Sequence, residues 1–219
     1  MDLKNKKFIF LGDSITEGCG TSDLNTKPFH QQLKQMAGLS EAINCGIGGT
    51  RIARQGEITN PVVDNDFNMR VDALDNDIDG IVVMGGTNDY GHGQAPLGTF
   101  EDRHVFTFYG AMHTLCVNLI RKYVDKTIVF MTPLHRHNEY GQGTWKPEGV
   151  EQRPLCEYAQ AVREVCEHYS IPVLDLFASG ELRGNDWDWC REYMPDGLHP
   201  NDKGHKIIAD KLQKFLEQL

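Results

Sequence analysis

The segment spanning residues 8–17 constrains the fold of this chain more than any other. It opens with an unbroken apolar run, residues 8–11, and then changes at once to Gly12-Asp13-Ser14. A short apolar run bounded by a glycine is typical of a strand buried on both faces of a parallel sheet. Such a strand brings Ser14 to the carboxyl edge of the sheet, where open α/β folds bind their ligands.

Two interpretations of Asp13-Ser14 are open from this segment alone. Asp and Ser are preferred helix caps, so the pair can simply begin a helix near Ile15. Alternatively, Ser14 is a nucleophile, because the N–H groups at a helix N-terminus favour developing negative charge. The rest of the chain has to decide between a cap and a catalytic serine.

Composition and charge exclude several classes of partner. The 219 residues include 22 basic and 31 acidic side chains, a net charge of −9, so a nucleic acid is not an expected partner. The first apolar run is too short for a secretory signal, and no stretch approaches membrane-spanning length. The six cysteines show no C-x-x-C spacing, which argues against a zinc or redox motif. We therefore expect a cytoplasmic protein with reduced thiols, with no membrane partner and no cofactor.

Segments with strand and helix patterns alternate along the rest of the chain. Further strands are predicted over residues 41–44, 78–84, 127–131 and 172–176, and helices over residues 28–36, 66–74, 107–123, 153–169 and 201–219. Residues 90–103, 132–150 and 178–194 have loop composition. This alternation predicts a single α/β domain over residues 1–219, with a five-stranded parallel sheet and helices on both faces.

Four polar clusters are expected at the carboxyl edge of this sheet. They are Ser14, the loop Gly46-Ile47-Gly48-Gly49, the segment Gly86-Thr87-Asn88-Asp89, and the segment Asp196-Gly197-Leu198-His199-Pro200. Acyl transfer requires a nucleophile, a base, a group that orients the base, and donors for an oxyanion. Asp196 precedes His199 by three residues, so a tight turn lets its carboxylate reach the imidazole.

These blocks, in this order, resemble the SGNH or GDSL-type esterases and acylhydrolases. The resemblance covers nearly the whole chain and includes Gly12-Asp13-Ser14-Ile15, in which isoleucine replaces the commoner leucine. It implies a flavodoxin-like, three-layer α/β/α sandwich with strand order 2-1-3-4-5, in agreement with the alternation of strands and helices. The G-x-S-x-G elbow of the α/β-hydrolases is absent from the chain.

The resemblance also implies a role for each block. Ser14 is implied as the nucleophile, His199 as the base, and Asp196 as the residue that orients His199. The backbone N–H groups of Ser14 and Gly49, together with the side chain of Asn88, are implied as the oxyanion hole. These assignments name the residues of an acyl-transfer site.

The second block leaves two glycines as candidates for one N–H donor. The family pattern continues with a polar residue and a threonine after its glycine, whereas this chain has Thr50-Arg51. Gly49 is favoured, and Gly48 stays open. Three glycines in four residues also allow a plain turn, while the G-x-G-x-x-G spacing of a dinucleotide loop is absent.

Aromatic and histidine side chains in the longest predicted loops each have two interpretations. Trp145, Trp187 and Trp189 either pack as core beneath the loops or form a wall for a sugar ring or an acyl chain. These tryptophans and Asp13 are the candidate substrate contacts. The histidines of His135-Arg136-His137 could bind a metal, but no carboxylate or cysteine partner stands at a firm spacing, so no metal site is predicted.

These inferences predict a serine esterase that hydrolyses a small acyl ester through an acyl-enzyme on Ser14. An acetyl-like group carried on a carbohydrate fits the aromatic loops best, and a lysophospholipid or a thioester stays open within the same chemistry. A catalytically silent binding module and a flavodoxin-like cofactor binder are alternatives from other classes. The expected partner is a small-molecule ester; a homo-oligomer, the acyl chain length and the alcohol are left open.

Overall fold

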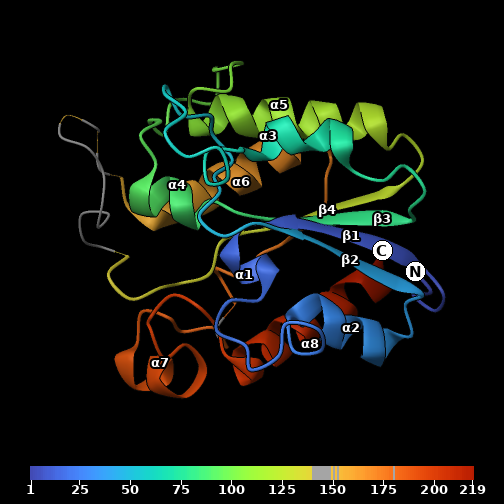
Figure 1. Cartoon of the computed structure of the whole chain (residues 1–219). Coiled ribbons are helices and arrows are strands. Elements are labelled where there is room, and N and C mark those ends of the chain that lie inside the picture. The colour runs from blue at the N-terminus through green and yellow to red at the C-terminus, as the bar shows by residue number, and fades with distance from the viewer. Residues whose placement is uncertain (140–148, 150, 152, 180) are drawn as a thin grey trace.

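Five parallel strands form one sheet in the computed structural model, which describes residues 1–139, 149, 151, 153–179 and 181–219 (Figure 1). In spatial order they are β2 (Glu41–Gly46), β1 (Lys7–Gly12), β3 (Gly80–Met84), β4 (Thr127–Met131) and β5 (Val173–Leu174). This order confirms the predicted flavodoxin-like topology. Strands β1 and β3 lie in the middle of the sheet and are buried almost throughout, as their apolar runs predict.

Helices cover both faces of the sheet (Figure 1). One face carries α3 (Phe67–Arg70), the following 3₁₀ turn η1 (Val71–Ala73), α5 (Phe108–Lys122) and α6 (Leu155–His168), and the other carries α2 (Phe29–Ala37) and α8 (Asp202–Gln218). The short helices α1 (Ser14–Glu17), α4 (Thr87–His92) and α7 (Trp187–Tyr193) lie toward the end away from the two termini. In the part of the chain that the structure describes, no helix is long and apolar enough to cross a membrane.

Two of the predicted loops contain helices, which corrects the sequence-based assignment. The predicted loop over residues 90–103 begins inside α4, and the loop over residues 178–194 contains α7. Helix α7 is stabilised by Asp186, whose carboxylate accepts the backbone N–H groups of Asp188 and Trp189 at 2.9 and 3.2 Å. Both helices are too short, at six and seven residues, to display a readable apolar period.

The five strands end in register at one edge of the sheet. Gly46 pairs with Gly12, Gly12 with Met84, Met84 with Met131, and Met131 with Leu174. The segments that follow these residues therefore leave the sheet side by side. This register brings the polar blocks of the sequence into one neighbourhood.

Helix α1 packs directly onto the strand ends, and two glycines make this close contact possible. A Cβ atom on Gly46 would lie 2.1 Å from the backbone nitrogen of Glu17, and one on Gly12 would lie 2.0 Å from Thr16 Oγ1. No side chain fits at either position, so the absence of a Cβ is required there. The two glycines therefore fix the height of Ser14 above the sheet.

Two buried histidines pack in the layer that contains α2 and α8. His30 lies against the ring of Phe10 with 5.2 Å between centroids, and its Nε2 donates to the carbonyl oxygen of Thr16 at 3.0 Å. His205 stacks on Phe29 at 6.0 Å, and its Nδ1 accepts the Phe29 N–H at 3.1 Å. Burial lowers the pKa of each histidine to about 4. Both rings are therefore neutral in the folded protein at neutral pH.

We expect the free energy of unfolding to fall as the pH drops from about 6.5 toward about 4. In this range the unfolded histidines bind protons that the folded ones do not, which favours the unfolded chain. Asp13, whose pKa burial raises to about 6, offsets part of this loss. Urea denaturation at about pH 7 and about pH 5 measures the effect.

Two variants test whether a buried histidine causes this pH dependence. His205→Asn keeps an acceptor oxygen for the Phe29 N–H but cannot titrate, so it should weaken the pH dependence. His104→Asn changes an exposed histidine and should not weaken it. Equal unfolding free energies for the wild type at the two pH values would contradict the prediction.

Candidate active site

Ser14 is the first residue of α1, and Asp13 caps that helix. Asp13 Oδ1 accepts the backbone N–H of Ile15 at 3.0 Å, and the residue is only 1 % exposed. Burial raises the pKa of Asp13 to about 6, against the lowering effect of the Ile15 hydrogen bond. The structure thus gives Asp13 a capping role, and its substrate contact stays a prediction. It leaves the Ser14 hydroxyl outside the cap, and the Ser14 N–H lies in the first turn, where such groups have no intrahelical partner.

A hydrogen-bonded chain links Ser14, His199 and Asp196. Ser14 Oγ lies 2.9 Å from His199 Nε2, and His199 Nδ1 lies 2.7 Å from Asp196 Oδ2. Because the carboxylate accepts at Nδ1, the neutral imidazole carries its proton there, and Nε2 is free to accept from the hydroxyl. We refer to these three residues as the relay.

A tight turn holds the carboxylate behind the imidazole. Asp196 Oδ1 accepts the backbone N–H groups of Leu198 and His199 at 2.9 and 2.7 Å, and Gly197 between them has a φ of 76°. Partial burial acts to raise the pKa of Asp196, but these bonds and the His199 ring hold it below its ordinary value. Asp196 is therefore ionised at neutral pH and acts as an acceptor.

Asn88 lies in α4, and its amide is held at both ends. Asn88 Nδ2 donates to the Thr50 carbonyl at 3.0 Å, and Asn88 Oδ1 lies 3.1 Å from His92 Nε2. Arg51 Nη1 donates to His92 Nδ1 at 3.0 Å, so the His92 proton resides on Nε2 and is donated to Asn88 Oδ1. Burial lowers the pKa of His92 to about 4, and the charge of Arg51 acts in the same direction. This arrangement fixes the Asn88 NH₂ group toward Thr50. The second N–H of that group has no partner among the described residues.

The two candidate N–H donors of the glycine loop, Gly48 and Gly49, differ in their contacts. The Gly48 N–H donates to Glu17 Oε2 at 2.8 Å, so a side chain already occupies it. The Gly49 N–H has no partner among the residues that the structure describes, and Gly49 adopts a φ of 76°, a left-handed conformation that favours glycine. The contacts therefore favour Gly49 over Gly48 as a donor to a ligand.

Sequence reasoning missed several residues that hold these loops together. Arg70 Nη2 donates to the Gly12 carbonyl at 3.0 Å, and its Nη1 donates to the Cys45 carbonyl at 3.0 Å. Asp89 accepts two backbone N–H groups of the segment after the glycine loop, at 2.9 and 3.0 Å. Arg51 also forms a buried ion pair with Asp64. The sequence carries no local signal for these contacts, because each partner lies far away in the chain.

The predicted aromatic contacts separate into three cases. Trp187 is 42 % exposed and lies against His137 with 4.6 Å between ring centroids. Trp189 stacks on Tyr193 and packs partly buried against the apolar cluster beneath α7 and α8, so it serves as core. Trp145 lies outside the described residues.

The histidines near residue 136 have ordinary protein partners. His135 Nδ1 lies 2.7 Å from Glu139 Oε2, and its ring packs on Phe177 at 3.9 Å between centroids. Over the described ranges, no group of three or more His, Cys, Asp or Glu side chains could hold a metal ion. His135 and His137 therefore have packing roles in this structure.

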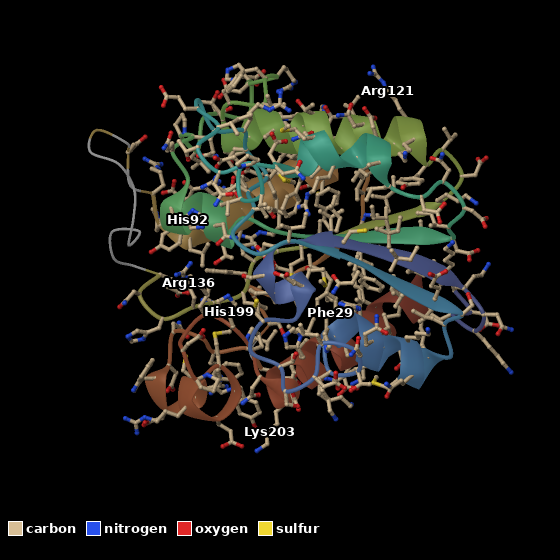
Figure 2. The ribbon with its side chains drawn as sticks, viewed as in Figure 1. Phe29, His92, Arg121, Arg136, His199 and Lys203 are labelled. Atoms are coloured by element: carbon tan, nitrogen blue, oxygen red, sulfur yellow. The ribbon has the colours of Figure 1, made fainter. Side chains whose placement is uncertain are left out.

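A cavity of about 230 Å³ adjoins the relay. Its wall includes Tyr90, Arg136, His137, Asp196 and Leu198. Figure 2 shows His199, Arg136 and His92 at the same end of the molecule, where the strands terminate. A ligand in this cavity lies beside Asp196 and the turn that carries His199, on the side of the relay away from Ser14.

Comparisons with known proteins agree with this fold and show the family. The model of the GDSL-like lipase/acylhydrolase family matches residues 10–207. A GDSL esterase/lipase of Arabidopsis thaliana, CPRD49, is 27 % identical over 78 residues, which are 35 % of this chain and only 29 % of that protein. A crystal structure of a Lactobacillus plantarum protein has a TM-score of 0.84 at 29 % identity and covers 98 % of both chains. The structure of the acetyl xylan esterase AlAXEase has the same fold, with a TM-score of 0.62 at 22 % identity over 95 % of this chain and 98 % of that one.

Proposed function

The chain belongs to the GDSL-like lipase/acylhydrolase family, and from that premise we propose that it hydrolyses a small acyl ester through an acyl-enzyme on Ser14. The observation that carries the proposal is the relay, with contacts of 2.9 and 2.7 Å from hydroxyl to imidazole to carboxylate. This is the arrangement that activates a serine hydroxyl. If the turn at residues 196–199 had only a structural role, it would not require a serine hydroxyl within hydrogen-bond distance of His199.

The proposed reaction has two half-steps. Ser14 Oγ attacks the acyl carbon while His199 Nε2 takes the hydroxyl proton, and the carbonyl oxygen becomes an oxyanion. His199 then gives the proton to the leaving alcohol, and the ester bond breaks. A water molecule, deprotonated by His199, cleaves the acyl-enzyme in the same manner and restores Ser14. Asp196 stays ionised throughout and stabilises the imidazolium.

We assign three N–H donors to the oxyanion in this mechanism. They are the backbone N–H groups of Ser14 and Gly49 and the remaining N–H of the Asn88 amide. Arg51 and His92 hold that amide in one orientation, so the donor is in place before the substrate binds. Preorganised donors of this kind stabilise the charge that develops in the transition state.

The proposed substrate carries a short, acetyl-like acyl group on a carbohydrate or another small alcohol. The exposed Trp187 beside the relay and the small size of the adjoining cavity support this choice. A lysophospholipid or a thioester would use the same chemistry. A flavin or nucleotide binder is disfavoured, because Glu17 places a carboxylate on the glycine loop, where a phosphate would be repelled.

A panel of 4-nitrophenyl esters of increasing chain length, assayed beside acetylated sugars, tests the proposal. We expect kcat/KM to be highest for the acetyl ester. A preference for long acyl chains would favour a lysophospholipase, and bound flavin absorbance in the purified protein would favour the cofactor binder. The absence of hydrolysis across the whole panel would contradict the esterase proposal.

Replacing Asn88 with alanine should lower kcat by roughly 10²- to 10³-fold and leave KM nearly unchanged, because an oxyanion donor acts mainly in the transition state. Steady-state kinetics with the best ester of the panel measure both constants. Asn118→Ala, on α5, is the matched control and should keep the wild-type kcat. A loss confined to KM would instead make Asn88 a substrate-binding residue.

A further inference from the structure

Arg136 is a charged side chain that lies beside the proposed site and borders a cavity. It lies on the wall of the cavity that Asp196 and Leu198 also line. The side chain is half-buried, and its Nε is buried without a hydrogen-bond partner among the described residues. Figure 2 shows Arg136 and His199 at the same end of the molecule, whereas Arg121 on α5 points away from the sheet.

Several contacts hold this guanidinium in place. Arg136 Nη1 donates to Thr87 Oγ1 at 3.1 Å and lies 3.3 Å from the Thr87 carbonyl. Its guanidinium carbon lies 5.6 Å from the centre of the Tyr90 ring, a cation–π contact. A Cβ on Gly91 would lie 3.0 Å from Nη1, so helix α4 presses closely against the side chain. These contacts orient Arg136 but do not neutralise its charge.

A buried charge normally has an ionic partner, because desolvation of an unpaired ion is costly. Throughout the part of the chain that the structure describes, Arg136 forms no ion pair with a carboxylate. Asp196 faces the same cavity, but its oxygens accept from Leu198 and from the backbone and ring of His199. The guanidinium therefore retains donors for a ligand.

We propose that this cavity binds a compact anionic group, with a carboxylate as the reference case, on the alcohol portion of the ester, and that Arg136 is its specificity-determining residue. The inference rests on the proposed esterase function and names the substrate class. A guanidinium presents several N–H donors in a plane, which suits a carboxylate or a phosphate.

The position of the cavity indicates that it receives the alcohol portion of the ester. The leaving alcohol takes its proton from His199, so it lies on the side of the turn formed by residues 196–199. That turn forms one wall of the cavity, and Arg136 forms another. An anionic group a few bonds from the alcohol oxygen reaches Arg136 while the acyl carbon stays at Ser14.

A matched pair of acetyl esters tests the inference. The probes are 4-acetoxybenzoate and 4-acetoxybenzamide, which share the acetyl group and the ring and differ in one negative charge. We expect the ratio of their kcat/KM values, charged over neutral, to fall by about 10- to 100-fold in Arg136→Met, mainly through KM of the charged ester. Arg136→Lys, which keeps the charge but loses the planar fork, should retain part of the preference. The ester 4-acetoxyphenyl phosphate, assayed in parallel, distinguishes phosphate from carboxylate as the preferred anion.

Control variants separate this inference from the esterase proposal. Arg121→Met removes an exposed arginine and should leave the ratio at its wild-type value. Calorimetric titration of Ser14→Ala with 4-acetoxybenzoate reads binding without turnover, and adding Arg136→Met should weaken that binding by a similar factor. Hydrolysis of both esters with a ratio that Arg136→Met does not change would overturn the inference alone. Failure to hydrolyse either ester would overturn the esterase proposal and this inference with it.

Discussion

Ser14→Ala is expected to abolish ester hydrolysis and to leave the fold intact. Loss of the serine nucleophile in comparable enzymes lowers kcat by on the order of 10⁴-fold or more. Among the residues that the structure describes, the Ser14 hydroxyl has one side-chain hydrogen bond, with His199, while Asp13 caps α1. Removing Oγ therefore removes the proposed nucleophile without removing a contact that holds the helix. Steady-state hydrolysis of a 4-nitrophenyl ester and the thermal midpoint, measured on the same preparation, test both parts.

Ser22 offers a matched control for this experiment. Ser22 Oγ donates to Asp202 Oδ2 at 2.6 Å, in an exposed contact outside the relay. Ser22→Ala should keep the wild-type kcat, and a serine-directed organophosphate should label Ser14 in both the wild type and this variant. A folded Ser14→Ala protein that retained a tenth of the wild-type activity would refute the nucleophile assignment.

Asp196→Asn is expected to lower kcat by up to about 10⁴-fold, the loss measured for the equivalent change in a well-studied serine protease. An asparagine can turn its NH₂ group toward His199 Nδ1, which moves the imidazole proton to Nε2. Nε2 then cannot accept from Ser14. The amide oxygen can still accept the Leu198 and His199 backbone N–H groups, so the turn should persist. The loss should therefore appear in kcat rather than in stability.

The pH profile gives the same experiment a second readout. In the wild type, activity should rise with pH through one ionisation, because His199 must be neutral to accept the serine proton. His199→Ala should lack this profile along with the activity. Asp202→Asn, which changes a carboxylate near the same helix start, should keep both. If Asp196→Asn and His199→Ala lose only stability and keep kcat per folded molecule, the segment is a structural turn.

Much of the fold could be predicted because its signals are local. The buried runs that form β1, β3 and β4 are apolar throughout, and the amphipathic helices α5, α6 and α8 begin and end close to the predicted residues. Asn201 caps α8 as its sequence position suggests, by accepting two backbone N–H groups at 3.0 and 3.2 Å. Helices α4 and α7 were missed because they span fewer than two full apolar periods.

The supporting contacts of the site could not be predicted for a different reason. His92 and Arg51 act on Asn88 through a hydrogen-bond chain whose members are 4 and 41 residues apart. Glu17 accepts the Gly48 N–H from 31 residues away and thereby favours Gly49 as the donor to a ligand. Such roles depend on tertiary positions and on proton placement, neither of which leaves a spacing pattern. In the sequence Arg136 stands between two histidines, and its lack of an ionic partner among the described residues is visible only in the structure.

The serine and the histidine of the relay are far apart in the sequence. Ser14 and His199 are 185 residues apart, and the segment around α1 is joined to the start of α8 by the Ser22–Asp202 and Phe29–His205 hydrogen bonds. During synthesis the serine is therefore made long before its base, and during synthesis or refolding a chain whose last helix has not docked has an unactivated hydroxyl. Recovery of enzymatic activity should consequently lag behind recovery of secondary structure. The time course of activity would then report when the last helix docks.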